Sequence, residues 1–205
     1  MAKGKKLIYE EVVWPTAMLK LCFLNEPSQP FDGKGDPMYK VRVLLEDTEE
    51  NRAKIEGALD RAREAAKKNG VKLKKVHKLP FLMPEDVDED DFIPAEGKDR
   101  PKYDEDYQGK IIFETKSKFP PMMIDAQRKA LPEDVKIYSG DQGRVKTEVM
   151  PYEGLGSGIS LRLKAVQLIA KNTSFSGGYN NTDGFDDVEG GYVAGGSSDD
   201  DDENF

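Results

Sequence analysis

"MYKVRVLLEDTEENRAKIEGALDRAREAAKKNG", residues 38–70, changes its hydrophobic period partway along, and this change decides the fold. In residues 38–46 apolar and basic side chains alternate, which predicts a half-buried strand with a basic outer face. One face of this strand carries Tyr39, Val41, Val43 and Leu45, and the other carries Lys40, Arg42 and Leu44. The strand therefore contributes to a core on one side and can meet a charged partner on the other.

Residues 48–69 have the period of an amphipathic helix. Asp47 or Thr48 is suited to the N-cap, acidic side chains fill the first turn, lysines fill the last, and Gly70 provides a C-terminal stop. The predicted apolar stripe comprises Ile55, Leu59, Ala62 and Ala66. A helix is thus expected between strands.

The remaining apolar segments read as strands joined by turns. We expect strands in residues 6–24 (two short strands, or one bent at Trp14), 109–119, 135–153 (two strands around a turn) and 159–171. Loops are expected at 25–37, at 84–106 as an irregular acidic insertion, at 122–132 as a short turn or helix, and at 154–158 as a flexible glycine loop. The pattern indicates a mainly β protein with one inserted helix, a small twisted barrel or sandwich of five or six strands, and a disordered tail at 172–205.

Charge is unevenly distributed along the 205 residues, so the net charge of -8 is misleading. Residues 183–205 hold nine acidic residues and no basic one, and residues 85–106 hold eleven acidic and three basic ones. This leaves 28 basic and 19 acidic residues elsewhere. A basic body favours a polyanionic partner, and the acidic segments suggest an internal competitor for it. Alternatively, the acidic runs only keep the protein soluble.

Catalytic and metal-binding functions are disfavoured by composition. The chain has one cysteine, Cys22, and one histidine, His77, which argues against disulfides, zinc sites and Ser/His or Cys/His triads, and suits a reducing cytosol. The acidic run at 86–91 lacks the glycine and glutamate of a calcium loop, and the glycines at 154–158 precede a strand rather than a helix. No signal peptide or membrane span is expected, and we predict no metal, no cofactor and no enzymatic activity.

Basic residues recur in pairs with one residue between them inside the predicted strands. Residues i and i+2 of a strand share a face about 6–7 Å apart, a spacing that suits the phosphates of an extended single strand. The alternative is that these are ordinary outer-face residues of antiparallel sheets. The predicted phosphate contacts are Lys40, Arg42, Lys110, Lys116, Lys118, Arg144, Lys146, Arg162 and Lys164.

Two aromatic residues are candidates for stacking on bases, which is largely indifferent to base sequence. Tyr152 lies at the end of a predicted strand before the glycine loop and is the first choice, and Trp14 is the second. Tyr39 and Phe113 share faces with Val41 and Ile111, so they are expected in the core.

The order of these features resembles the single-stranded DNA-binding proteins of short-tailed bacteriophages. The resemblance rests on "YKVRVLL" at 39–45, on "GRVKTEVMPYEGLGSGISLRLKAVQLI" at 143–169 and on an acidic tail that ends in Phe205, and it extends over nearly the whole chain. It implies an OB-fold domain at 1–171 and a disordered tail at 172–205. Tyr152 matches a family aromatic thought to stack on DNA, whereas Gly154 stands where better-known members have a second aromatic.

The function implied by this resemblance is sequence-tolerant coating of single-stranded DNA in phage replication and recombination, in the host cytoplasm. The tail is then expected to compete with DNA and to recruit replication proteins such as DNA polymerase and helicase-primase, and a homodimer is possible. The tail residues concerned are Asp199, Asp200, Asp201, Asp202, Glu203 and Phe205. The alternative is an acidic, chaperone-like interaction protein that binds basic partners and no DNA.

Overall fold

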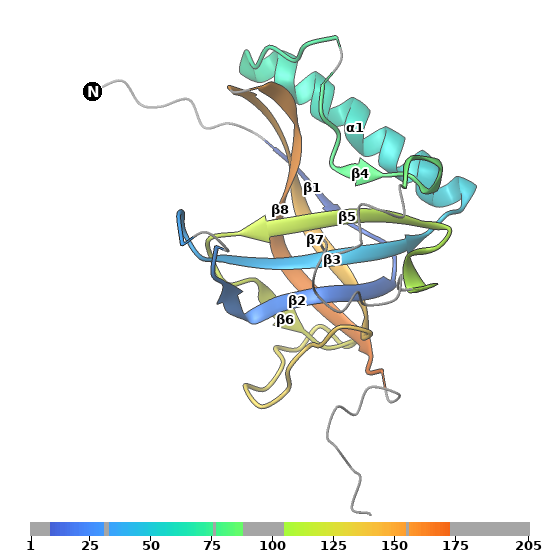
Figure 1. The fold of residues 1–205 in the computed structure, drawn as a ribbon, viewed down its shortest axis with the longest axis vertical. Helices are drawn as coiled ribbons and strands as arrows, with labels where there is room; N and C mark the ends of the chain where they lie inside the picture. Colours follow the sequence, from blue (N-terminus) through green and yellow to red (C-terminus); the bar gives the residue numbers. More distant parts are fainter. Residues whose placement is uncertain (1–8, 31–32, 76, 88–104, 155, 173–205) are drawn as a thin grey trace, which may run out of the picture. The chain divides into compact units, whose positions relative to one another are not determined.

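One long helix lies beside a strongly bent eight-stranded sheet in the part of the chain that the structure describes (Figure 1). This computed structural model describes residues 9–30, 33–75, 77–87, 105–154 and 156–172. The described residues belong to one compact unit, Met1–Ser174. The predictions made for the inner part of the acidic insertion, 88–104, and for the tail, 173–205, lie outside the described residues.

The helix α1 (Glu49–Asn69) begins and ends where the sequence predicts. The Thr48 side chain accepts a hydrogen bond from the Asn51 amide, and Gly70 closes the helix with φ 75°, a left-handed conformation that glycine adopts without strain. Its buried stripe consists mainly of small alanines, which let the helix pack closely on the sheet. The buried residues are Asn51, Ile55, Ala58, Leu59, Ala62 and Ala66.

Five strands form a ring in which each strand pairs with two neighbours. Two seams are short: the parallel seam is registered at Lys116 and Arg162, and the antiparallel one pairs Ala17 with Gly143 and Met18 with Gln142. In ring order the strands are β2 (Ala17–Ser28), β3 (Met38–Glu46), β5 (Lys110–Ser117), β8 (Gly156–Ala170) and β7 (Gln142–Gly154). The prediction of a mainly β fold with one inserted helix is confirmed. The sequence predicted a small barrel or sandwich, and the structure has a ring of five strands with two short seams.

Short elements extend the ring. Strand β1 (Glu10–Val13) pairs with β7, β4 (Phe81–Leu82) with β5, and β6 (Met122–Ile124) with β8. Two 3-10 turns, η1 (Pro84–Asp86) and η3 (Glu105–Tyr107), lie where the acidic insertion leaves and rejoins the sheet. Neither α1 nor any other described helix has the length and apolar character needed to cross a bilayer.

Four loop and strand predictions were wrong in whole or in part. Residues 154–158 are the end of a long hairpin, because β7 and β8 pair as far as Gly154 and Gly156. Residues 122–132 begin as strand β6 and continue as a turn in which the Asp125 carboxylate accepts bonds from the Gln127 and Lys129 amides. Residues 135–139 form no strand, and β2 continues to Ser28. Pairing with distant strands, which local composition does not report, decided the cases of β6 and β2.

Candidate nucleic-acid interface

Four strands contribute one continuous row of outward side chains, which we call the open row: Phe23, Lys40, Lys116 and Arg162. Each residue is the direct cross-strand neighbour of the next, so the row crosses β2, β3, β5 and β8. The Lys40 ammonium lies 5.0 Å from the centre of the Phe23 ring, and that ring is 38% exposed. The row therefore combines three cations with an accessible aromatic face.

Phe23 reaches this row through a β-bulge. Lys20 pairs with Arg42 but Phe23 pairs with Lys40, so β2 has one extra residue over this interval. Leu21, inside the bulge, has φ 47°, which strains any residue other than glycine. Simple alternation places Phe23 on the face opposite Lys20, so sequence reasoning missed Phe23 as a site residue, and nothing in the local sequence marks the bulge.

The row loses its positive charge on β7. Arg162 donates two hydrogen bonds to the Glu148 carboxylate, and Glu148 is the register partner of Arg162 on β7. Lys164 also approaches Glu148, at 3.6 Å. On the next strand Glu11 pairs with Lys146 at 2.5 Å, and the pKa of the Glu11 carboxyl is lowered by that hydrogen bond. These carboxylates come from neighbouring strands, so the basic pairs are less free than their own strands suggest.

The other half of the β3–β5 outer face is occupied by the ends of the acidic insertion. Tyr107, from η3, is 7% exposed and packs with Leu44 and Ile112. We call this group, together with Met18, Leu82 and Val87, the covered cluster. The Lys20 ammonium donates to Asp106 at 2.5 Å, and the Arg42 guanidinium lies over the Tyr107 ring at 5.9 Å. This half is closed by protein side chains.

The first turn of the insertion is held against α1 by one arginine. Arg52 donates to both oxygens of Asp47, at 2.6 and 2.9 Å, and to both oxygens of Glu85, at 2.9 and 2.8 Å. The Arg52 hydrogen bonds lower the pKa of the Glu85 carboxyl to about 2, and they also lower the pKa of Asp47. The arginine thus links the base of the insertion to the helix.

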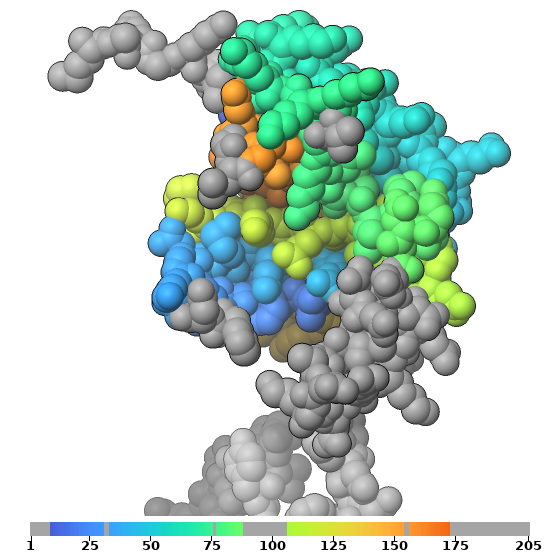
Figure 2. Space-filling model, turned by 45° about the horizontal axis from the view of Figure 1, so that its top comes forward, coloured from blue at the N-terminus to red at the C-terminus, as the bar shows by residue number. Residues whose placement is uncertain are grey.

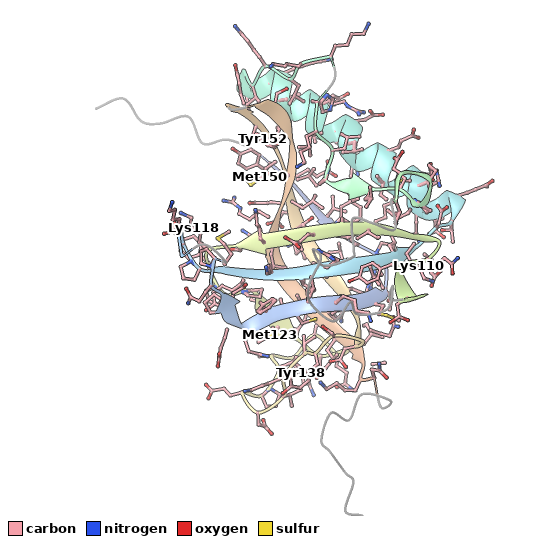
Figure 3. The ribbon with its side chains drawn as sticks, in the orientation of Figure 1. Lys110, Lys118, Met123, Tyr138, Met150 and Tyr152 are labelled. Carbon is pink, nitrogen blue, oxygen red and sulfur yellow. The ribbon has the colours of Figure 1, made fainter. Side chains whose placement is uncertain are left out.

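Tyr152 stands on β7 beyond the open row, and 38% of its surface is exposed. Its register partner on β8 is Gly158, and a Cβ at that position would lie 2.7 Å from both the Tyr152 hydroxyl and the Lys78 carbonyl. The missing side chain lets the tyrosine ring lie close to the backbone of two segments. Figure 3 shows Tyr152 and Met150 near the end of β5 that carries Lys118, far from Lys110 and Tyr138.

The prediction that Trp14 stacks on bases was wrong. Trp14 is fully buried, and its indole Nε1–H donates to Thr147 Oγ1 at 2.9 Å. Its ring packs against Phe81 and Phe113, with 5.3 Å between ring centres in each case. The residue closes the core, so no face of the indole is available to a base. Phe113 is buried as expected, and Tyr39 packs against the core while partly exposed.

The predicted phosphate contacts do not form one surface. Most of these predicted residues form an ion pair. Within the described ranges, only Lys40, Lys116 and Arg144 of this set have no ion-pair partner. Arg144 pairs with Gln167 at the opposite end of β7 from Tyr152. Lys110 and Lys118, at the two ends of β5, pair with Glu46 and Asp36. Arg42 lies 3.6 Å from Glu114 in addition to its contact with Tyr107.

The described residues contain no group of three or more His, Cys, Asp or Glu side chains placed to hold a metal ion. Burial raises the pKa of the Cys22 thiol to about 12, so the sulfur stays protonated and unreactive at neutral pH. The open row places three cations beside one exposed aromatic ring, an arrangement suited to contacts with phosphates and bases.

Comparisons with known proteins find similar single-stranded DNA-binding proteins of phages. The family model of the single-stranded DNA-binding protein of Enterobacter phage Enc34 matches residues 11–201. The solved structure of the Enc34 protein in complex with single-stranded DNA is similar with a TM-score of 0.60 and 16% identity, over 82% of this chain and 98% of that one. The solved structure of gp2.5, a single-stranded DNA-binding protein encoded by bacteriophage T7, is similar with a TM-score of 0.57 and 16% identity, over 84% and 96%.

Among curated proteins no sequence matches the chain. The solved structures are too distant in sequence to support more than the fold, which they share with this protein. The family model extends over nearly the full length, including the row, the hairpin and the insertion. The chain therefore belongs to the family of the single-stranded DNA-binding protein of Enterobacter phage Enc34.

Proposed function

We propose that this protein binds single-stranded DNA without base specificity and has no catalytic role. The observation that carries the proposal is the open row, in which Lys40, Lys116 and Arg162 are successive cross-strand neighbours and Lys40 lies over the exposed ring of Phe23. Neighbouring strands are about 5 Å apart, so the three cations can follow a sugar–phosphate backbone laid across the sheet. The match of residues 11–201 to the family model of the Enc34 single-stranded DNA-binding protein supports this assignment.

In this proposal phosphates lie on the open row and one base stacks on Tyr152. Cations that are held in ion pairs contribute less, because DNA must first displace their carboxylates. This applies to Lys110, Lys118, Lys146 and Lys164, and within the open row it applies to Arg162, which is bound to Glu148. Arg42 is held by Tyr107 and Glu114. Arg144 lies too far along β7 to contact the same stretch of DNA.

The first test is the salt dependence of binding, followed by the fluorescence anisotropy of a labelled oligo-dT. The logarithm of affinity should fall linearly with the logarithm of salt concentration, with a slope of about -0.7 for each phosphate contact. Affinity for the same sequence in duplex form should be lower, since stacking requires exposed base faces. Binding that ignores salt, or no binding at all, would contradict the proposal and favour an interaction protein for basic partners.

The stacking role of Tyr152 has a matched control in Tyr138, an exposed tyrosine at the other end of the molecule (Figure 3). Tyr152→Ala should weaken oligo-dT binding by about 1–3 kcal/mol, whereas Tyr152→Phe should retain most of the affinity. Tyr138→Ala should leave it unchanged. Equal losses in both alanine variants would mean that Tyr152 has no special contact with DNA.

The acidic tail is part of the same proposal. Its carboxylates imitate phosphates, and Phe205 imitates a base, so the tail competes with DNA and then docks on replication proteins such as a DNA polymerase or a helicase-primase, or on a second copy of the chain. The site of action is the host cytoplasm.

Deleting residues 183–205 should tighten oligo-dT binding, most clearly at low salt. Phe205→Ala should impair tail docking or partner recruitment, and DNA binding by the barrel itself should not depend on Phe205. Equal or weaker oligo-dT binding after the deletion would exclude competition.

A further inference from the structure

A second basic element lies outside the ring. The segment between α1 and β4 carries four exposed lysines, Lys72, Lys74, Lys75 and Lys78, which we call the lysine strap. No acidic residue occurs between positions 70 and 84. In the described part of the chain none of the four ammonium groups has an ion-pair or hydrogen-bond partner. By contrast, most of the cations on the ring are paired.

The strap is fixed to the end of the β7–β8 hairpin by its backbone. The Lys72 amide donates to Glu153 Oε2 at 3.0 Å and the Lys74 amide donates to Ser157 Oγ at 2.9 Å. The Lys78 amide donates to the Ser157 carbonyl at 3.1 Å, and its own carbonyl accepts from the Ile159 amide at 3.0 Å. Because these bonds use backbone groups, the lysine side chains stay free to contact solvent or a ligand.

The strap adjoins the proposed stacking residue. Lys78 pairs with Gly158 in a parallel bridge, and Gly158 is also the partner of Tyr152. Figure 2 shows the green segment that follows α1 lying against the orange part of β8, above the yellow-green surface of β5. From Arg162 the outer face of β8 leads to Gly158 in four residues, about 13 Å at the rise of a strand. Tyr152 and Lys78 therefore both adjoin Gly158, four residues along β8 from the open row.

We propose that the lysine strap is a second phosphate-binding element, which binds the DNA strand beyond the open row, beside Tyr152. This inference rests on the proposed function and adds a longer binding site. Two separated basic elements would hold a longer stretch of DNA than the row alone. OB folds contact between about 4 and 16 nucleotides, so oligonucleotides of the two lengths can distinguish the elements.

The test compares three double variants of the full chain, with oligo-dT of about 6 and about 16 nucleotides. Lys74→Gln with Lys75→Gln should weaken binding of the long oligonucleotide about tenfold and flatten the salt slope by about 1.4, the value for two phosphates. Binding of the short one should change less than about twofold. The control, Lys129→Gln with Lys136→Gln, removes the same charge from exposed positions near β6 and should change neither.

The third variant, Lys40→Gln with Lys116→Gln, should weaken binding of both lengths. If it does so while the strap variant behaves like the control, the strap inference is overturned and the proposed function stands. If the strap variant weakens both lengths equally, the strap does not act as a separate element, which also overturns the inference. If the unmodified protein binds neither oligonucleotide, the proposed function itself fails.

Discussion

Lys40 and Arg42 are two residues apart on the same face of β3, yet their surroundings differ completely. Lys40 rests on an exposed phenylalanine ring and has no ion pair among the described residues. Arg42 lies over Tyr107, near Glu114, beside a cluster of buried apolar side chains. The sheet face is thus divided into the open row and the covered cluster. A basic alternating strand shows which face points outward, but the packing of distant segments decides which part of that face a ligand can reach.

The division also gives the acidic insertion a structural role at its two ends. The described ends supply Val87 and the adjoining Tyr107 to the covered cluster, and Asp106 neutralises Lys20. Carboxylates and an aromatic ring thus occupy the half of the face that adjoins the open row. Under the proposed function we therefore expect DNA on the other half, which faces the β7–β8 hairpin.

The largest expected effect separates a buried aromatic from an exposed one. Tyr107→Ala should lower the free energy of unfolding by about 3–5 kcal/mol, because it leaves a cavity over Leu44 and Ile112. Tyr152→Ala should cost less than about 1 kcal/mol, since that ring is exposed. Urea denaturation measures both. Similar losses in the two variants would mean that the covered cluster is not a packed unit.

The next effect separates the two sets of cations. Lys40→Gln with Lys116→Gln should weaken oligo-dT binding by about 2 kcal/mol at low salt, roughly thirtyfold, through the loss of two charge-assisted contacts. The matched variant, Lys20→Gln with Arg42→Gln, should change the affinity by less than about threefold, because those cations are already engaged. Anisotropy titrations decide between them, and a greater loss in the matched variant would place DNA on the covered half.

A smaller effect tests the bulge that turns Phe23 outward. Phe23→Leu keeps an apolar side chain but removes the ring beneath Lys40, so oligo-dT binding should weaken by about 1 kcal/mol, the lower end of the stacking range. Leu79→Ala, at a similarly exposed apolar position, should leave binding unchanged. If Phe23→Leu leaves the affinity unaltered, only the three cations of the open row contribute to DNA binding.

The smallest effect concerns the anchor of the insertion and its dependence on pH. The pKa of Glu85 is about 2 in the folded protein and 4.5 ordinarily, so the Arg52 contact stabilises the fold above about pH 4.5 and is lost as the pH falls toward 2. Arg52→Gln should therefore lower the melting temperature slightly near pH 6 and by less at pH 2. Arg63→Gln, at another paired arginine of α1, serves as the control. A difference as large at pH 2 as at pH 6 would show that the arginine acts through packing instead.

Sequence reasoning anticipated the features that depend on neighbours along the chain. The period of residues 48–69, the cap at Thr48 and the stop at Gly70 specify α1, because helix signals act within a few residues. Alternation in 38–46 and 109–119 correctly marked β3 and β5, and the outward Lys40 and Lys116 followed from it. Burial of Trp14 was not anticipated, since the rings that enclose it come from residues 81 and 113.

By itself the sequence determined a mainly β chain with one helix, and a basic outer face on its strands. Only the tertiary structure decided that Phe23 turns outward at a bulge, that Glu148 and Glu11 end the row, and that Tyr107 and Asp106 close half of the face. The tertiary structure also placed the lysine strap beside Tyr152. The physical reason is that alternation is a local property of a strand. Register, ion pairing and coverage, in contrast, depend on which distant segments lie next to it.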